Sequence, residues 1–194
     1  MKVLVACEFS GVIREAFKAQ GHEAWSCDIL PSEKEGNHYL GDVRDILRPE
    51  NHWDLLIAHP PCTYLSYAGN VWLHQPGRLE KRAEAFEFFM MFINANVDKI
   101  CVENPLGYPA RAFRKPDQTI EPYQFGHNVK KRTCLWLKNL PKLVPTTPEV
   151  EPPKGKWDGK RYRNWIDVGP HSAKNRSRTF QGIADAMAKQ WGAQ

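Results

Sequence analysis

The chain has 194 residues, of which 42% are hydrophobic and 25% are charged, and its formal net charge at pH 7 is +5. These values are ordinary for a globular domain with its own core, and the charge favours polyanionic partners only weakly. No apolar run is long enough for a transmembrane helix and no signal peptide is recognisable. We therefore expect a cytoplasmic protein without a membrane partner.

The five cysteines are widely spaced and include no C-x-x-C pair, which argues against both a disulfide framework and a zinc site. Four of them lie in or beside apolar runs, and we expect these to be buried, reduced thiols: Cys7, Cys27, Cys101 and Cys134. Cys62 is the only cysteine on an expected loop. It is therefore the only thiol placed to react, and we expect no metal site.

The first 28 residues predict a βαβ unit, with strands at 2–6 and 23–28 around a helix at 11–20. Ser10 is a candidate N-cap for this helix, and Gly21 is a candidate for the residue that ends it. Further strands are expected at 38–40, 53–57 and 98–102, and the longest helix at 78–95.

Beyond residue 118 we expect an antiparallel hairpin of strands 122–127 and 132–138, and a last helix at 179–191. The pattern predicts one α/β domain over residues 1–194, with a Rossmann-like, mainly parallel sheet and an antiparallel edge hairpin. Residues 140–178 form an insertion rich in proline, glycine and basic residues.

Two of the expected parallel strands are followed by proline and by a reactive side chain. Pro60 and Pro61 follow the strand at 53–57 and hold Cys62 on a stiff turn, while Glu103 comes just before Asn104-Pro105 at the end of the strand at 98–102. Ligands of open α/β sheets bind at the carboxyl ends of strands. If these two strands are neighbours, the thiol and the carboxyl share one crevice. The alternative interpretation of Cys62 is a small core residue.

These segments together resemble the cytosine C5 DNA methyltransferases, in a short form like those of phages. Residues 58–69 are similar to that family's Pro-Pro-Cys-Gln loop, and Val102-Glu103-Asn104 to its Glu-Asn-Val strand end. Residues 128–132, Asn-Val-Lys-Lys-Arg, resemble its Gln-x-Arg-x-Arg motif. The order and spacing agree over nearly the whole chain. Departures are Thr63 in place of Gln, Lys130 in place of the first Arg, and the absence of a full target-recognition domain.

The resemblance implies that S-adenosylmethionine is the cofactor and assigns a set of residues to it: Phe9, Ser10, Gly11, Asp28, Ile29, Asp42, Val43 and Pro60. Within this set, Asp28 is expected to accept from the ribose hydroxyls and Asp42 from the adenine amino group. The residues alone leave other interpretations open, because Asp28 can be a turn former and Asp42 a helix N-cap.

The resemblance also implies the chemistry. The Cys62 thiolate would add to C6 of cytosine, a protonated Glu103 would stabilise the charge that develops at N3, and Arg132, with Lys130 nearby, would orient Glu103 or bind the base. The methyl group would then pass to C5. The target base must be flipped out of a duplex, unless the DNA is already single-stranded.

The segment 154–178 stands where relatives insert their DNA-reading domain. It holds eight lysine or arginine residues against two acids. Basic residues interleaved with aromatics favour contact with phosphates and bases, and the residues expected to bind nucleic acid are Lys154, Lys156, Lys160, Arg161, Arg163 and Trp165. The alternative interpretation is a solvated loop.

Three alternatives to a cytosine C5 methyltransferase remain open. One is an amino-methyltransferase, because residues 59–62, His-Pro-Pro-Cys, superficially resemble the Asp/Asn-Pro-Pro-Tyr loop of that class. Another is a catalytically degenerate protein that binds nucleic acid or a partner. The third is an enzyme that modifies a free nucleotide, or that adds another group at C5.

Overall fold

The computed structural model describes residues 1–147, 151, 156–157, 162–163 and 177–193. Seven strands form one sheet in the order β3-β2-β1-β4-β5-β7-β6. Their bounds are β1 Lys2–Ala6, β2 Glu23–Asp28, β3 His38–Leu40, β4 Leu55–Ala58, β5 Lys99–Asn104, β6 Gln118–Ile120 and β7 Thr133–Lys138. Strands β1 to β5 are parallel, and β7 runs antiparallel between β5 and β6. The expected mainly parallel sheet with an antiparallel pair at one end is confirmed.

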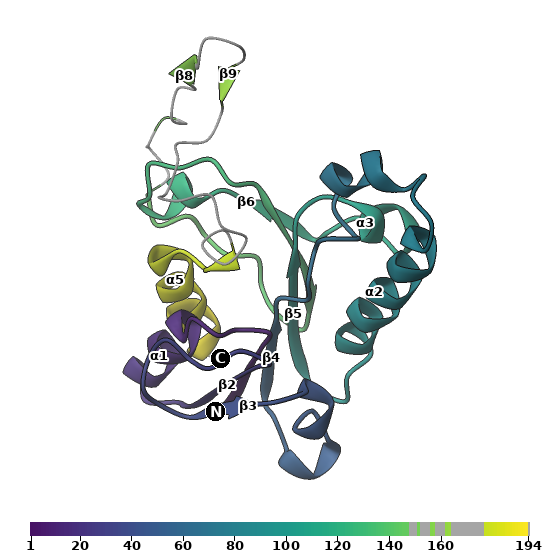
Figure 1. Cartoon of the computed structure of the whole chain (residues 1–194). Coiled ribbons are helices and arrows are strands. Elements are labelled where there is room, and N and C mark those ends of the chain that lie inside the picture. The colour runs from purple at the N-terminus through teal and green to yellow at the C-terminus, as the bar shows by residue number, and fades with distance from the viewer. Residues whose placement is uncertain (148–150, 152–155, 158–161, 164–176, 194) are drawn as a thin grey trace.

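Helices cover both faces of this sheet (Figure 1). On one face lie α1 (Val12–Ala19) and α5 (Gln181–Gly192), and on the other lie α2 (Arg78–Ile93) and α3 (Tyr108–Ala112). Four short 3-10 helices are η1 Val43–Asp45, η2 Pro49–Asn51, η3 Tyr67–Trp72 and η4 Pro122–Phe125. A two-stranded antiparallel pair, β8 (Lys156–Trp157) and β9 (Tyr162–Arg163), is separate from the main sheet.

The strands divide their side chains between two cores, because successive residues of a strand point to opposite faces. On β4, Leu55 and Ile57 pack in the core beneath α1 and α5, while Leu56 and Ala58 pack in the core beneath α2. The same alternation on β5 puts Cys101 on the α1–α5 face. Glu103 is two residues further along β5, so its side chain points to that face as well.

The expected strand at 122–127 is wrong. Pro122 begins the 3-10 helix η4, and a capping box formed by Glu121 and Gln124 caps its N-terminus. The strand that pairs with β7 lies earlier, at Gln118–Ile120, just before the stretch to which the sequence assigned it. The short helix α3 lies where the sequence predicted a loop over residues 108–118.

The turn at the end of η4 forms hydrogen bonds with two parts of the chain that are distant in sequence, Thr147 and the start of α5. The Thr147 hydroxyl donates to the Tyr123 carbonyl (2.9 Å) and accepts from the Gly126 amide (3.0 Å). The Gly182 amide at the start of α5 donates to His127 Nε2 (2.9 Å). A Cβ on Gly182 would stand 1.9 Å from the Phe125 carbonyl oxygen, so glycine permits this close approach.

Candidate functional site

The carboxyl ends of β4 and β5 are neighbours, as the sequence predicted, and the loops that follow them are joined. The Asn104 side chain donates to the Pro60 carbonyl (2.7 Å), and the Tyr108 amide donates to the Leu65 carbonyl (2.7 Å). Gly107, on the loop after β5, lies so close to the loop after β4 that a Cβ there would be 2.0 Å from the Leu65 oxygen. The two loops therefore form one connected surface above the ends of the strands.

Cys62 lies exposed on the first of these loops. Its carbonyl accepts from the Leu65 amide (3.0 Å) and the Ser66 amide (2.9 Å), which closes the turn after the two prolines. The other cysteines are buried or half-buried. Burial raises the pKa of the Cys7 thiol strongly and that of Cys27 to about 12, so these thiols stay protonated near neutral pH. Cys62 is the one exposed thiol of the five, as expected.

Glu103 lies within β5, one residue before its end, and receives polar contacts from two other elements. His59, just beyond β4, places its ring Nδ1 3.0 Å from Glu103 Oε2. The Thr133 hydroxyl at the start of β7 donates to Glu103 Oε1. Because β7 is antiparallel to β5, its first residues meet the last residues of β5. Three strand ends therefore converge on one carboxyl group.

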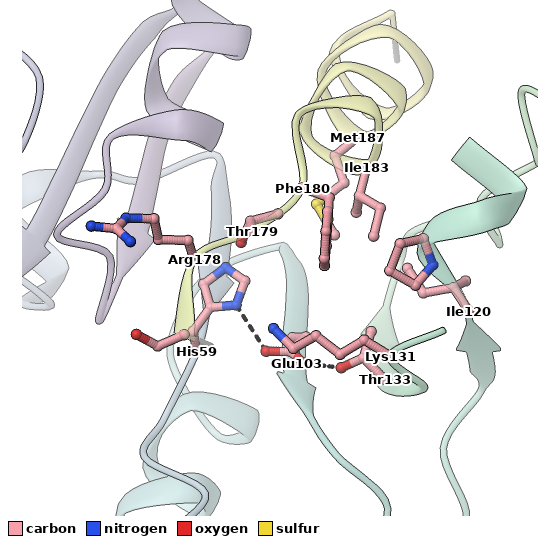
Figure 2. A pocket seen from close by; sticks show the side chains of 12 residues that line it. His59, Glu103, Ile120, Lys131, Thr133, Arg178, Thr179, Phe180, Ile183 and Met187 are labelled. Atoms are coloured by element: carbon pink, nitrogen blue, oxygen red, sulfur yellow. Dashed lines mark hydrogen bonds and ion pairs between the residues drawn. The ribbon is translucent and has the colours of Figure 1, made fainter. Parts of the chain in front are cut away.

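This carboxyl group lies in a pocket that α5 covers (Figure 2). Phe180, Ile183 and Met187 form its apolar wall, and the Lys131 side chain runs beside Glu103. The remaining polar lining includes Arg178 and Thr179. Cys62 does not line this pocket. The structure thus brings Glu103 and Cys62 to the same end of the sheet, with the carboxyl in the pocket and the thiol on the loop outside it.

Arg132 does not contact Glu103, so the expected orienting contact is corrected. Ile120 is opposite Thr133 in the β6–β7 register, which puts Glu121 opposite Arg132 one step further. The Arg132 Nε donates to Glu121 Oε1 at 3.4 Å, and its side chain is 66% exposed. Lys131, which has the same strand parity as Thr133, lines the pocket instead. Lys130 is half-buried and does not line it.

The loop expected to approach the cofactor is built around a buried carboxylate. Glu8, which the sequence interpretation did not single out, accepts from the Ile13 amide (2.7 Å) and the Arg14 amide (3.4 Å) at the start of α1. The expected N-cap role of Ser10 is therefore carried by Glu8, and Ser10 accepts only a long 3.4 Å bond from the Val12 amide. Burial raises the pKa of Glu8, and these amide bonds and the nearby His59 partly offset that rise. Phe9, Ser10 and Gly11 are buried.

The carboxyl ends of β2 and β3 present a more open surface. Asp28 ends β2 half-buried, and burial raises its pKa although its Oδ1 accepts from the Leu30 amide (2.9 Å). Ile29 beside it is 78% exposed, more than any other large apolar side chain in the part of the chain that the structure describes. Asp42 caps η1 through the Arg44 amide (2.9 Å), as the alternative interpretation had it, while Val43 is buried. Pro60 is buried as well.

The residues expected to bind nucleic acid are only partly described. Lys154, Lys160, Arg161 and Trp165 lie outside the described residues, and Lys156 and Arg163 belong to the paired strands β8 and β9. The sequence interpretation did not select the exposed aromatics of η3, where Tyr67 is 48% and Trp72 52% exposed. A signal was present, because both aromatics follow the Cys62 turn in a stretch with no acidic residue from 63 to 79.

Within the part of the chain that the structure describes, no group of side chains has the composition of a metal site. None of the described helices has the length and apolar character needed to cross a membrane. No protein-family model and no curated protein matches the chain.

Proposed function

We propose that this chain is an S-adenosylmethionine-dependent methyltransferase that acts on C5 of cytosine in DNA through a covalent adduct of Cys62. The observation that carries the proposal is the pairing of β4 with β5, which puts an exposed thiol and a hydrogen-bonded carboxyl group at one end of the sheet. The connected loops hold Cys62 in a defined turn at the same end of the sheet as that carboxyl group. The fold class agrees with the family that the sequence resembles.

The chain's own residues supply the two functions that addition to a cytosine requires. The Cys62 thiolate forms a bond to C6, and electron density moves toward N3. Glu103, as the carboxylic acid, donates its proton to N3 and becomes a carboxylate. After the methyl group has passed to C5, a base removes the C5 proton and the C6–S bond breaks, which re-forms the ring double bond and restores the thiolate, while N3 returns its proton to Glu103. For this, the base must lie between the exposed loop and the pocket of Glu103.

The residues at the ends of β2 and β3 fit the adenosine part of the cofactor. The half-buried Asp28 carboxylate can accept from ribose hydroxyls, and the exposed face of Ile29 can cover a flat ring. When bound, S-adenosylmethionine supplies an electrophilic methyl group. Glu8 occupies the N-terminal amides of α1, so that helix end offers little to the carboxylate of the methionine part.

Single-stranded DNA is the form of substrate that the described surface favours. Tyr67 and Trp72 are exposed on the loop that carries Cys62, and exposed aromatics stack on unpaired bases. Arg78 adds positive charge nearby, where its guanidinium stacks on the Tyr64 ring at 4.6 Å. A base that is already unpaired also avoids the free-energy cost of flipping.

The test is covalent trapping on a single-stranded oligonucleotide that contains 5-fluorocytosine, because fluorine at C5 blocks the final elimination. We expect a mass increase of the protein by one oligonucleotide only when S-adenosylmethionine is present, with the link mapped to Cys62. Cys62→Ser is the inactive variant, and Cys7→Ser is the matched control that should still be trapped. Absence of any adduct in the parent protein would leave a non-catalytic binding protein as the better interpretation.

A further inference from the structure

We propose that His59 is the positioning residue for Glu103, whose carboxyl group it orients through a hydrogen bond from its ring. This inference rests on the proposed function, in which Glu103 must face the base as a carboxylic acid. It also assigns to His59 the role that the sequence had given to Arg132, whose guanidinium pairs with Glu121 in the structure.

His59 and Glu103 meet because the alternation of side chains along β4 and β5 directs both to the same face of the sheet. His59 continues the alternation of Leu55 and Ile57, and its amide donates to the Ala6 carbonyl (3.0 Å), which extends β4 by one residue beside β1. Its side chain is 11% exposed, and its Nδ1 is 3.0 Å from Glu103 Oε2. Figure 2 shows the ring directed at the carboxylate. A ring held between two strands in this way has little freedom to turn.

The protonation of the ring follows from its two nitrogens. Nε2 is buried and has no hydrogen-bond partner among the described residues. A buried N–H without an acceptor costs more than a bare lone pair, so the neutral ring carries its proton on Nδ1. The Nδ1–H then donates to Oε2 while the Thr133 hydroxyl donates to Oε1. Two donors from two strands fix the plane of the carboxylate.

The other charged groups near His59 and Glu103 are Lys131 and Arg178, which line the pocket, and Glu8. Burial raises the pKa of Glu8, and the charge of His59 lowers it by a smaller amount.

The experiment measures the initial rate of 5-fluorocytosine trapping between about pH 5 and about pH 9, the range that spans imidazole titration. The variants are His59→Leu, which removes the donor, and His59→Asn, whose amide N–H keeps a donor near Nδ1 but cannot titrate. His52→Asn, an exposed histidine at the end of η2, is the matched control. In parallel, long-range ¹H–¹⁵N spectra of the histidine rings report which nitrogen of His59 carries the proton.

We expect His59→Leu to lose roughly tenfold to 100-fold in trapping rate, the size of effect that a misplaced catalytic group produces. His59→Asn should recover most of this loss, because its amide N–H restores a donor to Glu103. The spectra should show the neutral His59 ring protonated at Nδ1, with a titration that changes in Glu103→Gln. The inference is overturned if both variants keep the parental rate and pH profile, or if both lose activity equally while the profile stays parental. A parent protein that forms no adduct at any pH contradicts the proposed function instead, and the ring spectra still decide the contact with Glu103.

Discussion

Arg178 donates to both carboxylate oxygens of Glu33, at 2.6 Å and 2.8 Å, across 145 residues of chain. The guanidinium also stands 5.8 Å from the centre of the Phe9 ring, and the Glu33 amide donates to the Phe9 carbonyl (2.9 Å). The hydrogen bonds with Glu33 raise the pKa of Arg178. This pair joins the segment before α5 to the segment after β2, directly above the loop that precedes α1.

The first prediction concerns this pair. A double-mutant cycle with Arg178→Gln and Glu33→Gln should give a coupling free energy of about 0.2–1 kcal/mol in urea unfolding, the range for ion pairs near the surface. The coupling should shrink as salt is added, because salt screens partly exposed charges. The pair of Arg44 with Asp42, more exposed and local in sequence, is the control and should couple less. Strictly additive single effects would show that the contact is not formed in solution.

The second prediction concerns thiol reactivity. In the native protein a brief exposure to iodoacetamide should label Cys62 alone, because the other four thiols are shielded. Peptide mass spectrometry identifies the labelled residue. Cys62→Ser should remove the fast label, whereas unfolding in urea should make all five cysteines reactive. Fast labelling of Cys101 or Cys134 in the native state would contradict the described packing.

The third prediction concerns Glu8 and pH. Burial raises the pKa of Glu8 above 4.5, so the folded protein holds this proton more tightly than the unfolded chain does. Stability from this group is therefore greatest below that value and falls as the pH rises through the raised pKa. Glu8→Gln cannot ionise and keeps one oxygen for the Ile13 amide. Its free energy of unfolding should rise relative to that of the parent between about pH 5 and about pH 8. Parallel pH dependences of the two proteins would contradict this.

The fourth prediction concerns the cofactor. If Asp28 accepts from the ribose hydroxyls, Asp28→Ala should weaken binding of S-adenosylmethionine by roughly 1–3 kcal/mol, the cost of leaving such groups unpaired. Isothermal titration calorimetry measures this directly. Asp98→Ala is the matched control, since Asp98 precedes β5 at the opposite end of the sheet and accepts from Asn139. Equal affinity in Asp28→Ala and the parent would remove Asp28 from the site.

The sequence predicted the parallel strands well because each is a short apolar run that ends at proline, glycine or an acid. It placed Cys62 and Glu103 at the same end of the sheet because both follow such runs, but the structure puts only Glu103 in the pocket. It failed where contact depended on register. The pairing of Arg132 with Glu121 follows from β6 at Gln118–Ile120, and the sequence placed the partner strand at 122–127.

The contact between His59 and Glu103 was within reach of the sequence, because the alternation along each strand gives both residues the same face. What was missing was the observation that the alternation continues past the last strand residue. Glu8 gave no such signal. Its role depends on a turn in which Cys7 has a positive φ of 59°, and no pattern of residue types in the sequence reveals that conformation.

The turn at Gly126 and His127 makes this chain well suited to carry a module. The chain is fastened to that turn on the way out at Thr147 and again on the way back at Gly182. The ends of whatever lies between are thus held close together by bonds that do not involve it. Each doubling of the length of such a loop adds only about 0.6 kcal/mol to the entropic free-energy cost of closing it. A longer or shorter recognition unit can therefore be placed between residues 147 and 177, so that residues 177–180, which line the pocket, keep their positions.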